Sequence, residues 1–194
     1  MRAYQVVSYD KNPELVETNS PTPVNGEILL EISACGLNFG DLLMAKGQYQ
    51  EKPDLPFTLG MEVAGTIREV GEGVEGFEPG MRVLVGGGSG GLADFGTFPA
   101  TKAIRIPDSM SFTDAAAFQV AYGTSHVGLD YRARLQPGEN LLVLGAAGGV
   151  PGSLGVVEGD GQIPYTPEAA ATKQENAAHW IDRDPELKCY LPGI

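Results

Sequence analysis

Cysteine, tryptophan and basic residues are scarce in this chain of 194 residues. Its only cysteines are Cys35 and Cys189, which provide neither a disulfide framework nor a four-cysteine zinc site. Lysine and arginine number 13 against 25 aspartates and glutamates, so the formal net charge is −12. Because nucleic acids and anionic membrane surfaces are bound through basic patches, this balance argues against both as partners.

Long apolar runs are also missing. No run approaches the roughly 18 residues that cross a bilayer, and residues 1–7 contain no long apolar segment of the kind found in a secretory signal. We therefore expect no membrane partner and a reducing, cytoplasmic location. Glycine, with 27 residues, and proline, with 14, are abundant, which favours turns and short strands over helices.

Short apolar segments bounded by turn residues fill the chain up to residue 106. Strands are predicted at residues 2–8, 14–18, 27–34, 62–70, 81–85, 95–100 and 103–106. Their close spacing is typical of a small barrel or sandwich. A short helix is predicted over residues 38–46. The glycines of residues 86–91 predict a surface loop, because no Lys-Ser or Lys-Thr of a phosphate loop follows them.

The pattern becomes helical near residue 111. Ser111 is a predicted N-cap, and Asp114 stands three residues later as a carboxylate variant of the capping box. The helix is predicted to continue towards Ala133, with a break at Gly123. An apolar strand at residues 141–144 then runs into a glycine turn, which is how a dinucleotide-binding unit begins.

Several spaced motifs make residues 1–150 resemble the medium-chain dehydrogenase/reductase superfamily, in its zinc-free quinone oxidoreductase (zeta-crystallin-like) branch. The motifs are Cys35-Gly36-Leu37-Asn38-Phe39-Gly40-Asp41, Gly60-Met61-Glu62-Val63-Ala64-Gly65, Val70-Gly71-Glu72-Gly73-Val74, Phe77-Glu78-Pro79-Gly80-Met81-Arg82-Val83, Ala115-Ala116-Ala117 and the segment 142–150. The resemblance implies a mainly β fold with some α: a GroES-like barrel over 1–110, then a linking helix and the start of a truncated Rossmann domain over 111–150.

The same resemblance implies a reaction and a cofactor. The chemistry is hydride transfer from NADPH to a small-molecule substrate, a quinone or an activated alkene. Zinc-dependent relatives place a cysteine where Asn38 stands and a histidine where Met61 stands. A catalytic zinc needs about three ligands of the Cys, His or carboxylate type, and Glu62 alone does not hold one. The sequence therefore predicts no metal.

The resemblance places the predicted catalytic residues in or near the barrel. Asn38 is expected near the nicotinamide and the substrate, Tyr49 near the cofactor, and Asp41 beside Asn38. Each admits an ordinary structural role. Asn38 and Asp41 could cap the helix, and Asp41 could brace the turn. Tyr49 could either donate a hydrogen bond to a carbonyl group or cover a loop.

The predicted cofactor residues come later in the chain. The resemblance places Thr124 of the linking helix against the nicotinamide and Gly145, Ala146, Gly148 and Gly149 around the pyrophosphate. Thr124 could equally be an ordinary helix residue.

Two other residues that could carry chemistry are given structural roles. Cys35, with apolar neighbours, is interpreted as a buried small side chain. His126 is interpreted as a packed or exposed histidine.

After the glycine turn the sequence departs from the family. Pro151 stands at the third glycine position, and no crossover helix is visible after it. Residues 151–194 read as an unrelated tail with one helix and an irregular end, weakly resembling an uncharacterised bacterial family. Three hypotheses follow: a reductase impaired by a missing Rossmann domain, a non-catalytic GroES-like remnant that binds or oligomerises, and a truncated fusion product. The last two would expose an apolar docking face and favour self-association.

Overall fold

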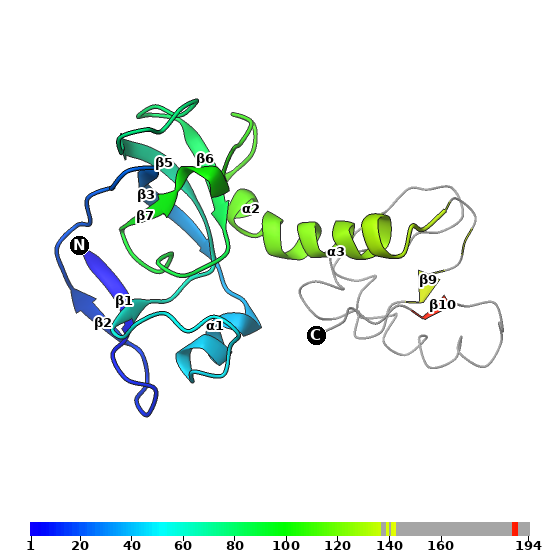
Figure 1. Cartoon of the computed structure of the whole chain (residues 1–194), viewed down its shortest axis with the longest axis horizontal. Helices are drawn as coiled ribbons and strands as arrows, with labels where there is room; N and C mark the ends of the chain where they lie inside the picture. The colour runs from blue at the N-terminus through cyan, green and yellow to red at the C-terminus, as the bar shows by residue number, and fades with distance from the viewer. Residues whose placement is uncertain (137–138, 140, 143–187, 190–194) are drawn as a thin grey trace. The chain divides into compact units, whose positions relative to one another are not determined.

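The computed structural model describes residues 1–136, 139, 141–142 and 188–189 (Figure 1). Two compact units divide the chain, Met1–Gln119 and Val120–Ile194. The predicted tail over 151–194 and the predicted boundary after residue 110 remain predictions, because most of the tail lies outside the described residues.

A five-stranded antiparallel sheet dominates the first unit, with the strand order β7-β3-β5-β6-β8. Its strands are β3 (Glu27–Gly36), β5 (Glu62–Val70), β6 (Arg82–Gly86), β7 (Phe95–Pro99) and β8 (Ala103–Arg105). All five were predicted from their apolar segments, and β3 and β5 form the longest pairing at the centre of the sheet. This confirms the mainly β fold class.

A second, three-stranded sheet has the order β2-β1-β4. It contains β1 (Arg2–Val6), β2 (Glu14–Glu17) and β4 (Phe57–Thr58). Strand β4 was missed, because its two residues follow a proline-rich loop and are too short to show alternation. Its pairing with β1 brings the segment that leads into Gly60 beside the N-terminal strand.

The core of the five-stranded sheet consists of aliphatic side chains with one aromatic ring. Its buried members are Ile28, Leu30, Val63, Ile67, Val83, Val85, Phe98 and Ala100. A separate cluster joins Val6, Met44, Phe57 and Leu59, and so packs helix α1 (Phe39–Ala45) against β1 and β4. Burial of these side chains, at about 25 cal/mol per Å² of apolar surface, is the main force that holds the elements together.

Helix α2 (Phe112–Ala116) begins where the sequence predicts. The Ser111 Oγ accepts a hydrogen bond from the Asp114 N–H at 3.0 Å. The Asp114 carboxylate binds the Ser111 hydroxyl at 2.6 Å instead of reaching the backbone, as it would in a standard capping box. A third cluster, which includes Ala115 and Ala116, packs this helix on the sheet.

The backbone beyond α2 remains helical, which makes the predicted break at Gly123 wrong. Two π-helical segments, η2 (Gln119–Gly123) and η3 (Val127–Arg132), flank the short helix α3 (Thr124–His126). Gly123 has φ −62° and ψ −44°, so it keeps a right-handed helical conformation. A glycine lowers helix propensity by about 1 kcal/mol, which is too little by itself to end a helix.

The second unit also contains a parallel pair of two-residue strands, β9 (Leu141–Leu142) and β10 (Lys188–Cys189). Strand β9 confirms the first two residues of the strand predicted at 141–144, whose other two residues lie outside the described part of the chain. The prediction that the end of the tail is irregular is wrong at Lys188–Cys189. In the described part of the chain, no helix has both the length and the apolar character to cross a membrane.

The glycine-rich stretch of residues 86–91 forms a loop, as predicted, but it is not all at the surface. Gly91 is buried, and a Cβ atom there would lie 2.4 Å from Val63 and 3.0 Å from the Cys35 Sγ. The prediction of a plain surface loop is therefore wrong at its C-terminal end. The end of the loop lies beside Gly60, whose carbonyl oxygen accepts a hydrogen bond of 3.0 Å from the Gly91 N–H.

Candidate functional site

Asn38 lies between strand β3 and helix α1, at the N-cap position of the helix. Its backbone is extended, with φ −122° and ψ 155°, so the chain turns sharply into the helix at this residue. The side-chain Nδ2 donates a hydrogen bond of 2.9 Å to Oε1 of Glu62, which is 24 residues away at the start of β5. The amide is therefore held to a carboxylate on a neighbouring element.

Asp41 is buried, with only 5% of its surface exposed. Its two oxygens accept hydrogen bonds from two backbone N–H groups, that of Asn38 at 2.9 Å and that of Gly60 at 3.0 Å. The first bond closes the helix start, and the second ties α1 to the segment before β5. This geometry gives Asp41 the bracing role that the sequence left open, and its catalytic role remains a prediction.

Glu62 is the site residue that sequence reasoning gave no role, beyond judging it insufficient for zinc. It is only 4% exposed, although it carries a carboxylate. It pairs with Gly36 on β3 and with Gly86 on β6, so glycines flank it on both sides. The sequence feature that could have identified Glu62 is its place as an acidic residue at the start of an apolar strand. A carboxylate at such a position is rarely buried without a partner.

Tyr49 and Met61 approach the site across Gly40. A Cβ atom at Gly40 would lie 2.7 Å from the Met61 Sδ and 3.2 Å from the Tyr49 ring. Both side chains are partly buried and pack against the cluster of Val6, Met44, Phe57 and Leu59. Tyr49 and Asn38 are thus brought to the same helix, and the catalytic role of Tyr49 remains a prediction.

Cys35 is partly buried at the end of β3 and packs against the core of the five-stranded sheet. Burial, followed by the nearby carboxylates of Asp41 and Glu62, raises the pKa of its thiol to about 12. A thiol of this kind stays protonated and is a poor nucleophile. Its position supports the interpretation of Cys35 as a packing residue.

Only one of the predicted cofactor residues lies in the described part of the chain. Thr124 is an exposed residue of α3 in the second unit. Gly145, Ala146, Gly148 and Gly149 lie outside the described residues, so their role stays a prediction. His126 is also exposed, and its Nε2 lies 3.7 Å from the Asp130 carboxylate.

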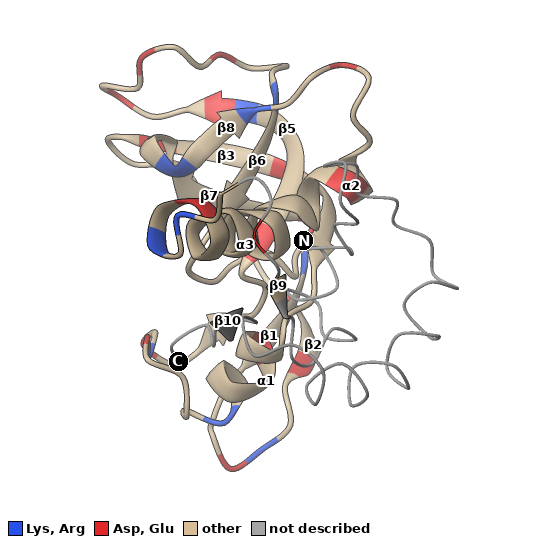
Figure 2. Ribbon diagram, turned by 90° about the vertical axis from the view of Figure 1, so that its right-hand side faces the viewer, with Lys and Arg blue, Asp and Glu red and all other residues tan. Residues whose placement is uncertain are grey.

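No metal centre is built from the described residues, where His, Cys, Asp and Glu side chains form no group of three that could hold an ion. The site instead offers an amide at Asn38 and a thioether at Met61. Acidic positions dominate its unit, and basic positions occur singly or in small groups among them in the view of Figure 2. The polar contacts of Asn38 are hydrogen bonds to the carboxylates of Asp41 and Glu62.

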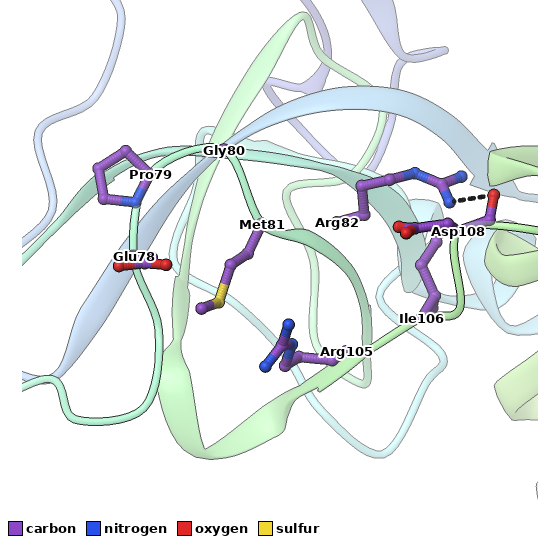
Figure 3. A pocket seen from close by; sticks show the side chains of 8 residues that line it. All are labelled: Glu78, Pro79, Gly80, Met81, Arg82, Arg105, Ile106 and Asp108. Carbon is purple, nitrogen blue, oxygen red and sulfur yellow. Dashed lines mark hydrogen bonds between the residues drawn. The ribbon is translucent and has the colours of Figure 1, made fainter.

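A separate pocket lies between the β5–β6 turn and strand β8 (Figure 3). It is lined by Glu78, Pro79, Gly80, Met81, Arg82, Arg105, Ile106 and Asp108. Arg82 donates to the carbonyl oxygens of Pro107, Asp108 and Met110 and stacks on the Phe112 ring. Arg82 thus holds the segment between β8 and α2, and no predicted site residue lines the pocket, so the pocket is not the candidate site.

Comparisons with known proteins give one consistent result. The model of the alcohol dehydrogenase GroES-like domain matches residues 24–108. The quinone oxidoreductase-like protein 2 homolog of Nematostella vectensis is 42% identical over 152 residues, which are 76% of this chain and 42% of that protein. The quinone oxidoreductase of Rattus norvegicus is 37% identical over 155 residues, 77% of this chain and 47% of that protein.

Solved structures agree with these relatives. The human synaptic vesicle membrane protein VAT-1 homolog-like protein has a TM-score of 0.75 and 34% identity, over 79% of this chain and 50% of that chain. The Thermus thermophilus quinone oxidoreductase, also solved in complex with NADPH, has a TM-score of 0.69 and 34% identity, over 79% of this chain and 48% of that chain.

The chain spans about two fifths to one half of the length of the relatives it matches. Within that span the GroES-like sheets, the loop and helix that carry Asn38, and the helical segment after Ser111 are all present. On this combined evidence residues 24–108 form an alcohol dehydrogenase GroES-like domain, and the chain is similar to members of the medium-chain dehydrogenase/reductase superfamily in its quinone oxidoreductase branch.

Proposed function

We propose that this chain is an NADPH-dependent, zinc-independent reductase of quinones or activated alkenes, and that its described residues form the substrate-binding part. The observation that carries the proposal is the hydrogen-bonded set of the partly buried Asn38 and the buried carboxylates of Asp41 and Glu62 around the start of α1. Relatives named as quinone oxidoreductases, one of them solved with NADPH, and a second similar structure in complex with NADPH support the reaction class. NADPH would supply the hydride.

The role of the described residues is to bind and orient the acceptor. Reduction of a quinone or an enone places negative charge on a carbonyl oxygen, which a hydrogen-bond donor stabilises. The Asn38 Nδ2 carries two hydrogens, one of which binds Glu62, and the other can serve as that donor. Exposed apolar side chains stand beside it: Leu37, Phe39 and Leu42, which are 75%, 73% and 60% exposed. They suit a flat apolar acceptor.

The test is consumption of NADPH, followed by its absorbance, with a quinone and an enone as acceptors. We expect oxidation of one NADPH per two-electron acceptor, retained after treatment with a chelator. Asn38→Ala should lower kcat/KM by about tenfold, the effect of about 1.4 kcal/mol at the transition state, whereas the exposed Asn12→Ala should not change it. No NADPH oxidation above the protein-free rate would refute the proposal.

A non-catalytic binding module is the second candidate, favoured by the exposure of Leu37, Phe39 and Leu42. Monomeric proteins seldom leave such side chains clustered in water unless they meet a partner. The partner in this case would be a second copy of the chain. Sedimentation velocity should then show a concentration-dependent dimer that Phe39→Ser weakens, and a monomer at all concentrations would reject this candidate.

A further inference from the structure

We propose that Glu62 is the positioning residue of Asn38: its buried carboxylate determines which way the Asn38 amide faces. The consequence for turnover rests on the proposed function, whereas the orientation itself does not. Glu62 reaches Asn38 from a different strand, and the two residues join through the bond of 2.9 Å between Nδ2 and Oε1. Their coupling is invisible in the sequence, where 24 positions separate them.

The chemistry of the pair allows only one arrangement. An ionised carboxylate accepts hydrogen bonds and donates none, whereas an amide has a donating and an accepting end. If the Asn38 amide turned by half a rotation, its oxygen would face the oxygen of a side chain that is only 4% exposed. Water would not shield this contact well, so the reversed orientation would be costly. The carboxylate therefore fixes the amide.

Glycine makes room for this contact. Gly36 pairs directly with Glu62, and a Cβ atom on Gly36 would lie 2.5 Å from Oε1 and 2.7 Å from the backbone oxygen of Ala116. The Glu62 carboxylate thus occupies the space that the side chain of any residue other than glycine would need at position 36. On the other side, the Gln119 amide covers Gly86 in the same way, 2.2 Å from where a Cβ would stand. Gly36 thus makes room for the Glu62 carboxylate, and Gly86 makes room for the Gln119 amide.

Asn38 is therefore held at two points by two different carboxylates. Asp41 accepts from its backbone N–H, and Glu62 accepts from its side chain. The first fixes where Asn38 lies. The second acts with the Asp41 N–H, from which the Asn38 side chain accepts in the capping box, to fix how the amide is turned. A donor held in advance in this way needs no reorganisation when charge develops on an acceptor, which is the property that makes such groups effective in catalysis.

The orientation is tested by NMR of the Asn38 side-chain amide in the full chain and in Glu62→Gln. Glutamine fills nearly the same volume but offers both a donor and an acceptor, so it tolerates both orientations of Asn38. We expect slowly exchanging Asn38 amide protons in the wild type, and shifted, faster-exchanging ones in Glu62→Gln. Glu69→Gln, an exposed change on the same strand, is the matched control. Unchanged Asn38 amide signals in Glu62→Gln would overturn the proposal.

A charge-exchange pair covers the case in which Glu62→Gln folds poorly. Asn38→Asp alone sets two carboxylates against each other and should lower the melting temperature. Adding Glu62→Gln restores a donor–acceptor pair of reversed polarity, so the double variant should melt above Asn38→Asp. A double variant that melts at or below Asn38→Asp would contradict the pairing.

Kinetics separate this proposal from the proposed function. If the chain reduces quinones, Glu62→Gln should lower kcat by about tenfold with a smaller change in KM, because positioning acts on the transition state. An unchanged kcat would refute the effect on turnover. If the wild type shows no NADPH-dependent reduction, the proposed function fails, and the NMR and melting experiments still decide the orientation.

Discussion

Replacement of Asp41 by asparagine tests the framework on which Asn38 depends. The wild-type carboxylate accepts from two backbone N–H groups at 2.9 and 3.0 Å, and the residue is 5% exposed. Asparagine keeps one accepting oxygen and turns an NH₂ group towards the other N–H. One donor thus loses its acceptor, and a buried unsatisfied donor costs about 1–3 kcal/mol. We expect the free energy of unfolding to fall by about 2 kcal/mol.

Urea unfolding followed by far-ultraviolet circular dichroism measures this change. The exposed Asp54→Asn removes a charge of the same kind and should change the free energy of unfolding by less than about 0.5 kcal/mol. Hydrogen exchange adds a local readout, since the Gly60 amide should lose protection in Asp41→Asn. An Asp41→Asn variant as stable as Asp54→Asn, with Gly60 still protected, would refute the bracing role.

Three other predictions follow from the described contacts. Cys35 has a pKa of about 12, so its thiolate fraction at pH 8 is about 10⁻⁴. In Cys189→Ser protein, Cys35 should therefore be alkylated at pH 8 roughly a thousandfold more slowly in the native state than in denaturant. Equal rates in the two states would contradict the burial of Cys35. Gly71→Ala should lower the free energy of unfolding by about 2 kcal/mol or more, because its Cβ would lie 1.9 Å from the Val24 oxygen. Gly123→Ala should raise it by about 0.5–1 kcal/mol, because the residue is helical and nothing lies within 4 Å of its Cβ. Denaturant unfolding that ranks the two variants in the reverse order would disprove this prediction. Hydrogen bonds from Arg2 lower the pKa of Asp94. The contribution of Asp94 to stability is therefore present above the ordinary aspartate pKa and is lost as the pH falls through the lower pKa of the folded state. Asp94→Asn should reduce the loss of stability in this acidic range, and an unchanged dependence of stability on pH would count against the ion pair.

The sequence was a good guide where the information is local. Strand β5 was predicted with the bounds it has, Glu62–Val70, because its apolar residues are flanked by glycines. The cap at Ser111 was predicted because its partner is only three residues away. By contrast, a break at Gly123 was predicted from composition, and the helical backbone continues there because one glycine is a small penalty.

The site was only partly predictable for a physical reason. Asn38, Asp41 and Tyr49 were found because their motif is contiguous, and they do lie on or beside α1. The partner of Asn38 was not found, because a hydrogen bond between a loop and a distant strand depends on sheet register. Gly36 and Gly86 pair with Glu62 on the two neighbouring strands. The sequence contains both glycines, but it does not show that they face Glu62, because this depends on how β3, β5 and β6 pair.

Calorimetric titration of the full chain with NADPH tests the central claim most directly, because a hydride donor must be bound before any acceptor can be reduced. We predict saturable binding of one NADPH per chain in the micromolar range, with NADP⁺ competing for the same site. Asn12→Ala should leave the titration unchanged. Absence of binding heat and of competition at millimolar NADPH would contradict a reductase function for this chain.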